Sequence, residues 1–112
     1  RKAMDITDAA SIEAALDRLQ PWAIVNTAGF VRVPEAEHQP DDCFRINTTG
    51  PELLAAACRK RGIPFVTFSS DLVFDGKLGR PYLEPDPTSP ACVYGESRPM
   101  PRTGCSPSTR MP

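Results

Sequence analysis

The stretch Ile63-Pro64-Phe65-Val66-Thr67-Phe68-Ser69-Ser70-Asp71 decides the fold class of this chain. A short apolar run that ends in small polar residues is typical of a buried strand in a parallel sheet. A second such run, Trp22-Ala23-Ile24-Val25, ends in Asn26-Thr27-Ala28-Gly29. Residues 41–61 lie between the runs, have apolar residues at helical spacing and end before Gly62. Strand, helix and strand form a βαβ unit, so the sequence predicts an α/β fold whose strands are buried on both faces.

Three details refine this prediction. Residues 8–19 predict an amphipathic helix that is capped by Asp8, and Pro51 must start a helical segment or kink a longer one. We expect Asn47 to bond the backbone or a water inside the helical layer. Ligands of open α/β sheets bind beyond the carboxyl ends of the strands, so the polar ends of both predicted strands should face one crevice.

Composition excludes several classes of function. The 112 residues suit one domain, and a net charge of −1 disfavours binding to nucleic acid or to an anionic membrane. No apolar run approaches the roughly 18 residues that a membrane span needs. The four cysteines form no C-x-x-C pair and the only histidine is His38, so we expect no metal site, no disulfide framework and a reducing, cytoplasmic location.

Two blocks carry a resemblance to a known family. Ser69-Ser70-Asp71-Leu72-Val73-Phe74-Asp75-Gly76 and Tyr94-Gly95-Glu96-Ser97 resemble the S-T-D-x-V-F-D-G and Y-G-x-S-K motifs of the dTDP-4-dehydrorhamnose reductase family, within the extended short-chain dehydrogenase/reductase superfamily. The likeness spans residues 4–97. It implies the central part of an NAD(P)-binding domain, with a partial Rossmann-like, doubly wound parallel sheet and flanking helices.

The resemblance also implies catalytic roles. Tyr94 matches the general acid that protonates a sugar 4-keto oxygen, and Ser70 matches the hydroxyl that hydrogen-bonds the same oxygen. Asp71 would lie beside the substrate. A free tyrosine has a pKa of about 10, so the family places a lysine four residues further on to stabilise the phenolate. Arg98 occupies that lysine position here, and a planar guanidinium does not reproduce an ammonium.

The cofactor implied by the family is NADPH or NADH, and the implied partner is a nucleotide sugar, with a possible homodimer in the full-length protein. The matching positions for the cofactor are Asp5, Ile6, Ala28, Gly29, Phe30, Phe68, Tyr94 and Arg98. Plainer interpretations exist for some of them. Asp5 could belong to a turn before a helix, Ser70 could end a strand and Tyr94 could be a packing residue.

Two departures from the family pattern shape our expectations. The glycine-rich phosphate loop is absent, so we expect an internal fragment that is inactive alone. Residues 98–112 are rich in proline and lack periodicity, so we expect a disordered tail. Loss of one adenine base just before an AGG codon for Arg98 would shift the reading frame and explain this tail. Resequencing the gene and finding an intact frame would exclude that explanation.

Other functions stay open. A nucleotide-sugar epimerase or dehydratase would share these motifs. A non-catalytic regulatory subunit, similar to the β subunit of methionine adenosyltransferase, would bind the dinucleotide without turning over a sugar, and Arg98 slightly favours it.

Overall fold

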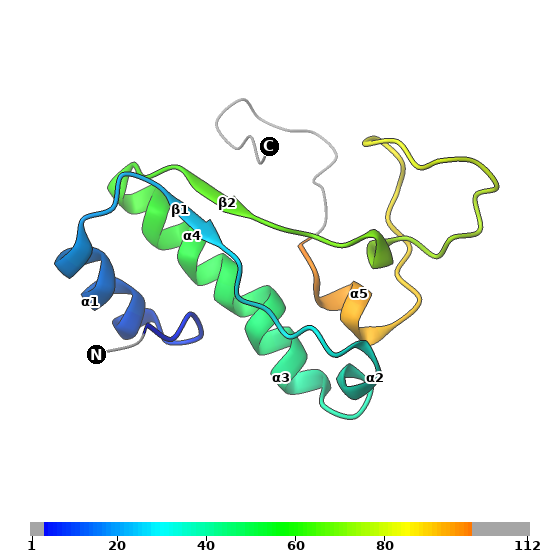
Figure 1. Cartoon of the computed structure of the whole chain (residues 1–112), viewed down its shortest axis with the longest axis horizontal. Coiled ribbons are helices and arrows are strands. Elements are labelled where there is room, and N and C mark those ends of the chain that lie inside the picture. Colours follow the sequence, from blue (N-terminus) through cyan, green and yellow to red (C-terminus); the bar gives the residue numbers. More distant parts are fainter. Residues whose placement is uncertain (1–3, 100–112) are drawn as a thin grey trace.

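A computed structural model describes residues 4–99, in which helices alternate with two strands (Figure 1). Helix α1 (Ala9–Leu19) begins where the Asp8 carboxylate accepts a hydrogen bond from the Ala10 N–H. It ends at Gln20, whose left-handed backbone (φ 43°) lets its N–H bond the Leu16 carbonyl. The predicted helix over 8–19 and its cap are confirmed.

Strands β1 (Ile24–Asn26) and β2 (Phe65–Thr67) pair in parallel, with Asn26 opposite Thr67. The Asn26 side-chain amide donates to the Thr67 hydroxyl at 3.2 Å, which joins the two strands at their carboxyl ends. The βαβ unit is therefore confirmed, and the polar segments that follow the two strands leave from the same edge of the sheet.

The prediction that both faces of the strands are buried is wrong for the described residues. On one face, Ile24 and Phe65 pack against a core formed by Ile12, Leu16, Leu54 and Ala57 of α1 and α4. Val25 points the other way and is 59% exposed. Continuous apolar runs are found where helices cover both faces of a sheet, whereas α1 and α4 cover only one face here.

The connection between the strands is longer and more segmented than one helix. A short helix, α2 (Val33–Ala36), is followed by α3 (Pro40–Phe44), a π-helical turn η1 (Arg45–Thr49) and α4 (Gly50–Arg61). Pro51 has no N–H to donate, and the wider turn of η1 accommodates this defect without ending the helical layer. Gly62, at φ 66°, closes α4 as predicted.

The remaining described segment connects β2 to the last helix. The single-turn 3₁₀ helix η2 (Asp71–Val73) precedes an irregular loop that reaches away from the sheet, and helix α5 (Val93–Ser97) follows it (Figure 1). At Asp75-Gly76 the chain turns, with Gly76 at φ 78°, and the Lys77 N–H donates to the Asp75 carboxylate.

Side chains hold the long loop together internally. Arg80 forms a two-pronged ion pair with Asp86, with both contacts at 2.9 Å, and the Phe74 and Tyr82 rings stack at 4.1 Å. Hydrogen bonds from Arg80 and from the Leu83 N–H lower the pKa of Asp86 to about 2. Within residues 4–99 no helix has the length and apolar character to cross a membrane.

Candidate active site

Tyr94 and Arg98 form the centre of the site. Tyr94 lies on α5 and is 8% exposed. Its hydroxyl oxygen accepts hydrogen bonds from Nε of Arg98 at 3.0 Å and from Nη2 at 2.6 Å, and the guanidinium carbon lies 4.9 Å from the ring centroid. A cation next to a phenol stabilises the phenolate form, which is the effect that the sequence motif predicts for this position.

Two side chains fix the start of the Tyr94 helix, one from a distant segment and one from the capping residue itself. The Glu37 carboxylate accepts from the Val93 N–H at 2.9 Å, and the Cys92 sulfur accepts from the Gly95 N–H at 3.4 Å. The first N–H groups of a helix have no partner within it, so these acceptors satisfy two of them. The helix that carries Tyr94 is therefore held at its first turn as well as by its buried ring.

The loop after β1 contacts the same guanidinium. A Cβ placed on Gly29 would lie 3.2 Å from Nη2 and 3.3 Å from Nη1 of Arg98, and 3.3 Å from Oδ1 of Asn47. A larger residue would push the arginine away from the loop. Gly29, Tyr94 and Arg98, which the sequence predicted as cofactor or catalytic residues, are thus brought together.

A buried polar cluster lies behind this group. Asn47, on the π-helical turn, accepts from the Phe30 N–H at 2.8 Å and donates to the Phe30 carbonyl at 3.1 Å and to the Ser97 hydroxyl at 3.0 Å. Asn47 is 1% exposed. The expected backbone-bonding role of Asn47 is confirmed, and its partner is the loop that the resemblance assigns to the dinucleotide.

The turn that carries Ser70 and Asp71 packs directly on the Tyr94 helix. Ser70 caps η2, where its Oγ accepts from the Leu72 N–H at 3.2 Å and also lies 3.2 Å from the Asp71 carboxylate. Leu72 packs against the cluster that contains Tyr94. The half-buried Ser70 and the exposed Asp71 therefore stand on the element next to the general-acid candidate.

Comparison with protein families gives a match over residues 1–100 to the family described as RmlD substrate binding domain. The chain belongs to the RmlD substrate binding domain family. This family membership agrees with the reductase resemblance of the two sequence motifs.

Several relatives of this RmlD-family chain are reductases, and its structural neighbours also include UDP-glucose 4-epimerases. It is 44% identical over 92 residues to a dTDP-4-dehydrorhamnose reductase of Streptomyces griseus, covering 82% of this chain and 30% of that protein. A reductase structure from Clostridium acetobutylicum superposes with a TM-score of 0.81 at 34% identity, covering 84% of this chain and 34% of that one. One from Bacillus anthracis in complex with NADP gives 0.81 at 29% identity, covering 85% and 34%. The RmlD-family chain spans about a third of these relatives, and its fold is Rossmann-like α/β.

Phe30, another predicted cofactor residue of this RmlD-family member, packs against the cluster that contains Tyr94, whereas Asp5 and Ile6 make their contacts elsewhere. The Asp5 carboxylate accepts from the N–H and the hydroxyl of Thr7, and these bonds, the backbone one first, lower the pKa of Asp5. Asp5 thus shapes the turn before α1, as its plainer interpretation expected. Ile6 packs on Gly50 of α4, and Phe68 is 55% exposed just beyond β2.

Sequence reasoning missed several residues that build the site. They are Glu37, Cys43, Thr48 and Ser97, which join helices far apart in the chain. Ser97 lies within the Tyr94-Gly95-Glu96-Ser97 motif, but no spacing rule links positions 49 to 56 residues apart. His38, the histidine noted in the sequence, is exposed. Most of the predicted disordered tail, residues 100–112 with Cys105, lies outside the part of the chain that the structure describes.

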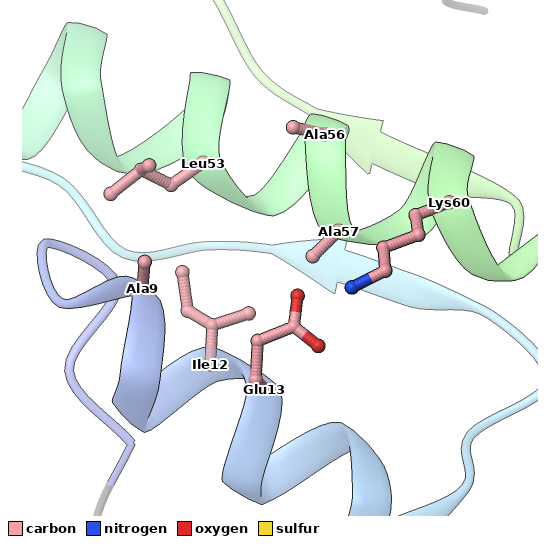
Figure 2. Close-up of a pocket in the computed structure, with 7 residues that line it drawn as sticks. All are labelled: Ala9, Ile12, Glu13, Leu53, Ala56, Ala57 and Lys60. Atoms are coloured by element: carbon pink, nitrogen blue, oxygen red, sulfur yellow. The ribbon is translucent and has the colours of Figure 1, made fainter.

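A shallow hollow between α1 and α4 offers no competing active site. Figure 2 shows that Glu13 and Lys60 extend toward the same end of an otherwise apolar surface. The lining residues are Ala9, Ile12, Glu13, Leu53, Ala56, Ala57 and Lys60. The apolar residues of this hollow include the core members Ile12 and Ala57, and its Glu13 carboxylate is already paired with Arg61.

Proposed function

We propose that the protein containing this chain is an NAD(P)H-dependent reductase of the 4-keto group of a dTDP-4-dehydro-6-deoxy sugar. The observation that carries the proposal is the double hydrogen bond from Arg98 to the Tyr94 oxygen. A hydroxyl oxygen accepts two hydrogen bonds and donates one. With both acceptor positions used by Arg98, the Tyr94 hydrogen points away from the cation and is free to protonate a substrate oxygen.

Tyr94 acts as the general acid in this mechanism. When its proton passes to the keto oxygen, the phenolate that remains faces the Arg98 guanidinium, which offsets the new negative charge without any rearrangement. The guanidinium of Arg98 supplies positive charge in this step and not the proton. The pair therefore supplies a proton at one oxygen and stabilises the charge left behind.

Ser70 and Asp71 hold the sugar. The Ser70 hydroxyl, at the end of the strand next to the Tyr94 helix, donates to the keto oxygen and orients the carbonyl, and this requires it to turn from Asp71. The Asp71 carboxylate is exposed and accepts from sugar hydroxyls. These roles use the side of η2 that the loop leaves open to solvent.

The residues present fit a nicotinamide dinucleotide. Gly29 lacks a side chain where one would meet the guanidinium, Ala28 is small and exposed, and Phe68 presents an exposed apolar ring at the end of β2. By the family resemblance, Asp5 and Ile6 would lie toward the adenine, and Phe30 would lie with Ala28 and Gly29 in the loop beneath the dinucleotide. The bound NADPH or NADH would supply the hydride. The thiols of Cys43, Cys58 and Cys92 are free, which supports a reducing, cytoplasmic location.

The test is an assay of NADPH and NADH oxidation with a dTDP-4-dehydro-6-deoxy sugar on the purified protein that carries this sequence. Tyr94→Phe should lower kcat by about 10²- to 10⁴-fold, because the variant lacks only the hydroxyl. Tyr82→Phe is the matched control, since the chain has two tyrosines. Tyr94→Phe turnover equal to that of the control would contradict the proposal.

A further inference from the structure

The Ser97 hydroxyl uses its full hydrogen-bonding capacity inside the protein. Its oxygen accepts from Nδ2 of Asn47 at 3.0 Å and from the Cys43 thiol at 3.2 Å, and its hydrogen goes to the Tyr94 carbonyl at 2.7 Å. Ser97 is 0% exposed. One donor and two acceptor positions are all that a serine hydroxyl has, so the site leaves none for solvent.

The bond to the Tyr94 carbonyl replaces a missing helical bond. Helix α5 has five residues, and the N–H of Arg98 donates to the Gly95 carbonyl at 3.3 Å, not to the carbonyl of Tyr94. The Ser97 side chain therefore caps the carbonyl of Tyr94 itself. The Thr48 hydroxyl, which donates to the Ser97 carbonyl at 2.7 Å, holds the same turn from the opposite helix.

The same hydroxyl is also connected to the loop after β1. The Asn47 amide nitrogen donates to the Ser97 hydroxyl and to the Phe30 carbonyl, and the amide oxygen accepts from the Phe30 N–H. Arg98 follows Ser97 directly, and its guanidinium reaches both Tyr94 and the face of Gly29. Ser97 thus lies on the polar path between the residues proposed for proton transfer and those proposed for the cofactor.

We infer that Ser97 is a positioning residue, which sets where Tyr94 and Arg98 stand relative to the loop at residues 28–30. This inference rests on the proposed function. Proton and hydride must reach the same carbonyl group, so the distance between the phenol and the dinucleotide loop controls the rate. A displacement of about 1 Å at such a site costs roughly 10²-fold in turnover.

The variant Ser97→Ala removes all three hydrogen bonds and leaves the volume nearly unchanged. We expect kcat to fall about 10- to 100-fold, with KM for the sugar nucleotide changed less than threefold, because Ser70 and Asp71 stay in place. Ser97→Thr retains the hydroxyl and should restore part of the rate. Leu54→Ala, in the separate core cluster of α1 and α4, is the control that lowers stability without touching the site.

A second readout does not depend on turnover. In the 112-residue chain, the Nε–H group of Arg98 lies close to the Tyr94 ring. The ring current therefore shifts the ¹⁵N–¹H resonance of this group. Ser97→Ala should move this resonance toward that of a free arginine, and Leu54→Ala should leave it in place. If the unmutated protein shows no reductase activity, the proposed function fails and the resonance alone decides the inference. An unshifted resonance, or Ser97→Ala turnover equal to that of Leu54→Ala, would overturn it.

Discussion

Gly95 lies against the main chain of Leu72 so closely that a Cβ on Gly95 would be 2.1 Å from the Leu72 carbonyl oxygen. No side chain can move to relieve such an overlap, because the neighbouring atom belongs to the backbone. Leu72 follows Ser70 and Asp71, and Gly95 follows Tyr94. The glycine of the Y-G-x-S motif therefore allows the general-acid candidate and the substrate-binding candidates to approach each other.

Gly95→Ala should separate α5 from η2. We expect a loss of at least about 1–3 kcal/mol in the free energy of unfolding, which is typical of overpacking, and it should be measured by urea denaturation. Gly50→Ala is the control with a milder overlap, because its Cβ would lie 2.7 Å from the Ile6 side chain, which can move aside. A smaller loss for Gly95→Ala than for Gly50→Ala would contradict the close contact.

Asn47→Asp should be strongly destabilising near neutral pH. The carboxylate keeps the bond from the Phe30 N–H but loses both donors, and it places a charge opposite the Phe30 carbonyl in a site that is 1% exposed. We expect a cost of about 3 kcal/mol by chemical denaturation. Thr48→Val, which removes one bond to the Ser97 carbonyl, should cost about 1 kcal/mol. Equal losses of unfolding free energy in the two variants would mean that the Asn47 amide contributes no more to the cluster than the single Thr48 bond.

Arg98 variants separate charge from geometry. Arg98→Met removes the cation from Tyr94 and should lower kcat by about 10²-fold or more, measured by NADPH oxidation in the protein that carries this sequence. Arg98→Lys keeps the charge on a single ammonium, so its loss should be smaller, and it matches the lysine of the family motif. Full activity of Arg98→Met would show that Tyr94 needs no cation.

The long loop should respond to acid. The pKa of Asp86 is about 2, below its unfolded value of about 3.9, so the Arg80 pair stabilises the loop above pH 4. That stabilisation is lost as the pH falls from about 4 to about 2. The near-UV circular dichroism of the stacked Phe74 and Tyr82 rings reports the change. In Asp86→Asn the signal should be weaker and its acid transition smaller, and what remains comes from Asp75, which accepts from the Tyr82 hydroxyl and whose pKa is lowered by the Lys77 N–H. An unchanged acid transition would count against the ion pair.

Local signals predicted much of the fold. Asp8 caps the start of α1 and Gly62 caps the end of α4, and the two apolar runs pair in parallel as expected. The exposure of Val25 was not predictable, because it depends on which helices lie over the sheet and not on the strand itself. The π-helical turn was also missed, since Pro51 indicates a defect but not how the backbone absorbs it.

The candidate site was predictable only where a motif spans it. Tyr94 and the cation four residues later are one helical turn apart, and the structure pairs them. The bonds of Asn47 to Phe30 and to Ser97 join segments 17 and 50 residues apart, which no periodicity reveals. Asp5 shows a third case, because the resemblance predicts a cofactor role that remains a prediction, while the hydrogen bonds of its carboxylate go to Thr7, two residues away.

The π-helical turn at Arg45–Thr49 makes this region sensitive to chain length. Each residue advances an α-helix by about 100°. Deleting one residue from the π-helical turn would yield a regular helix in which α3 is rotated by about 100° relative to α4. Cys43 would swing out of the interior while Leu54 kept its place, and the amide of Asn47 could no longer face both Phe30 and Ser97. Insertions and deletions in this segment should therefore be tolerated far less well than substitutions on its exposed side.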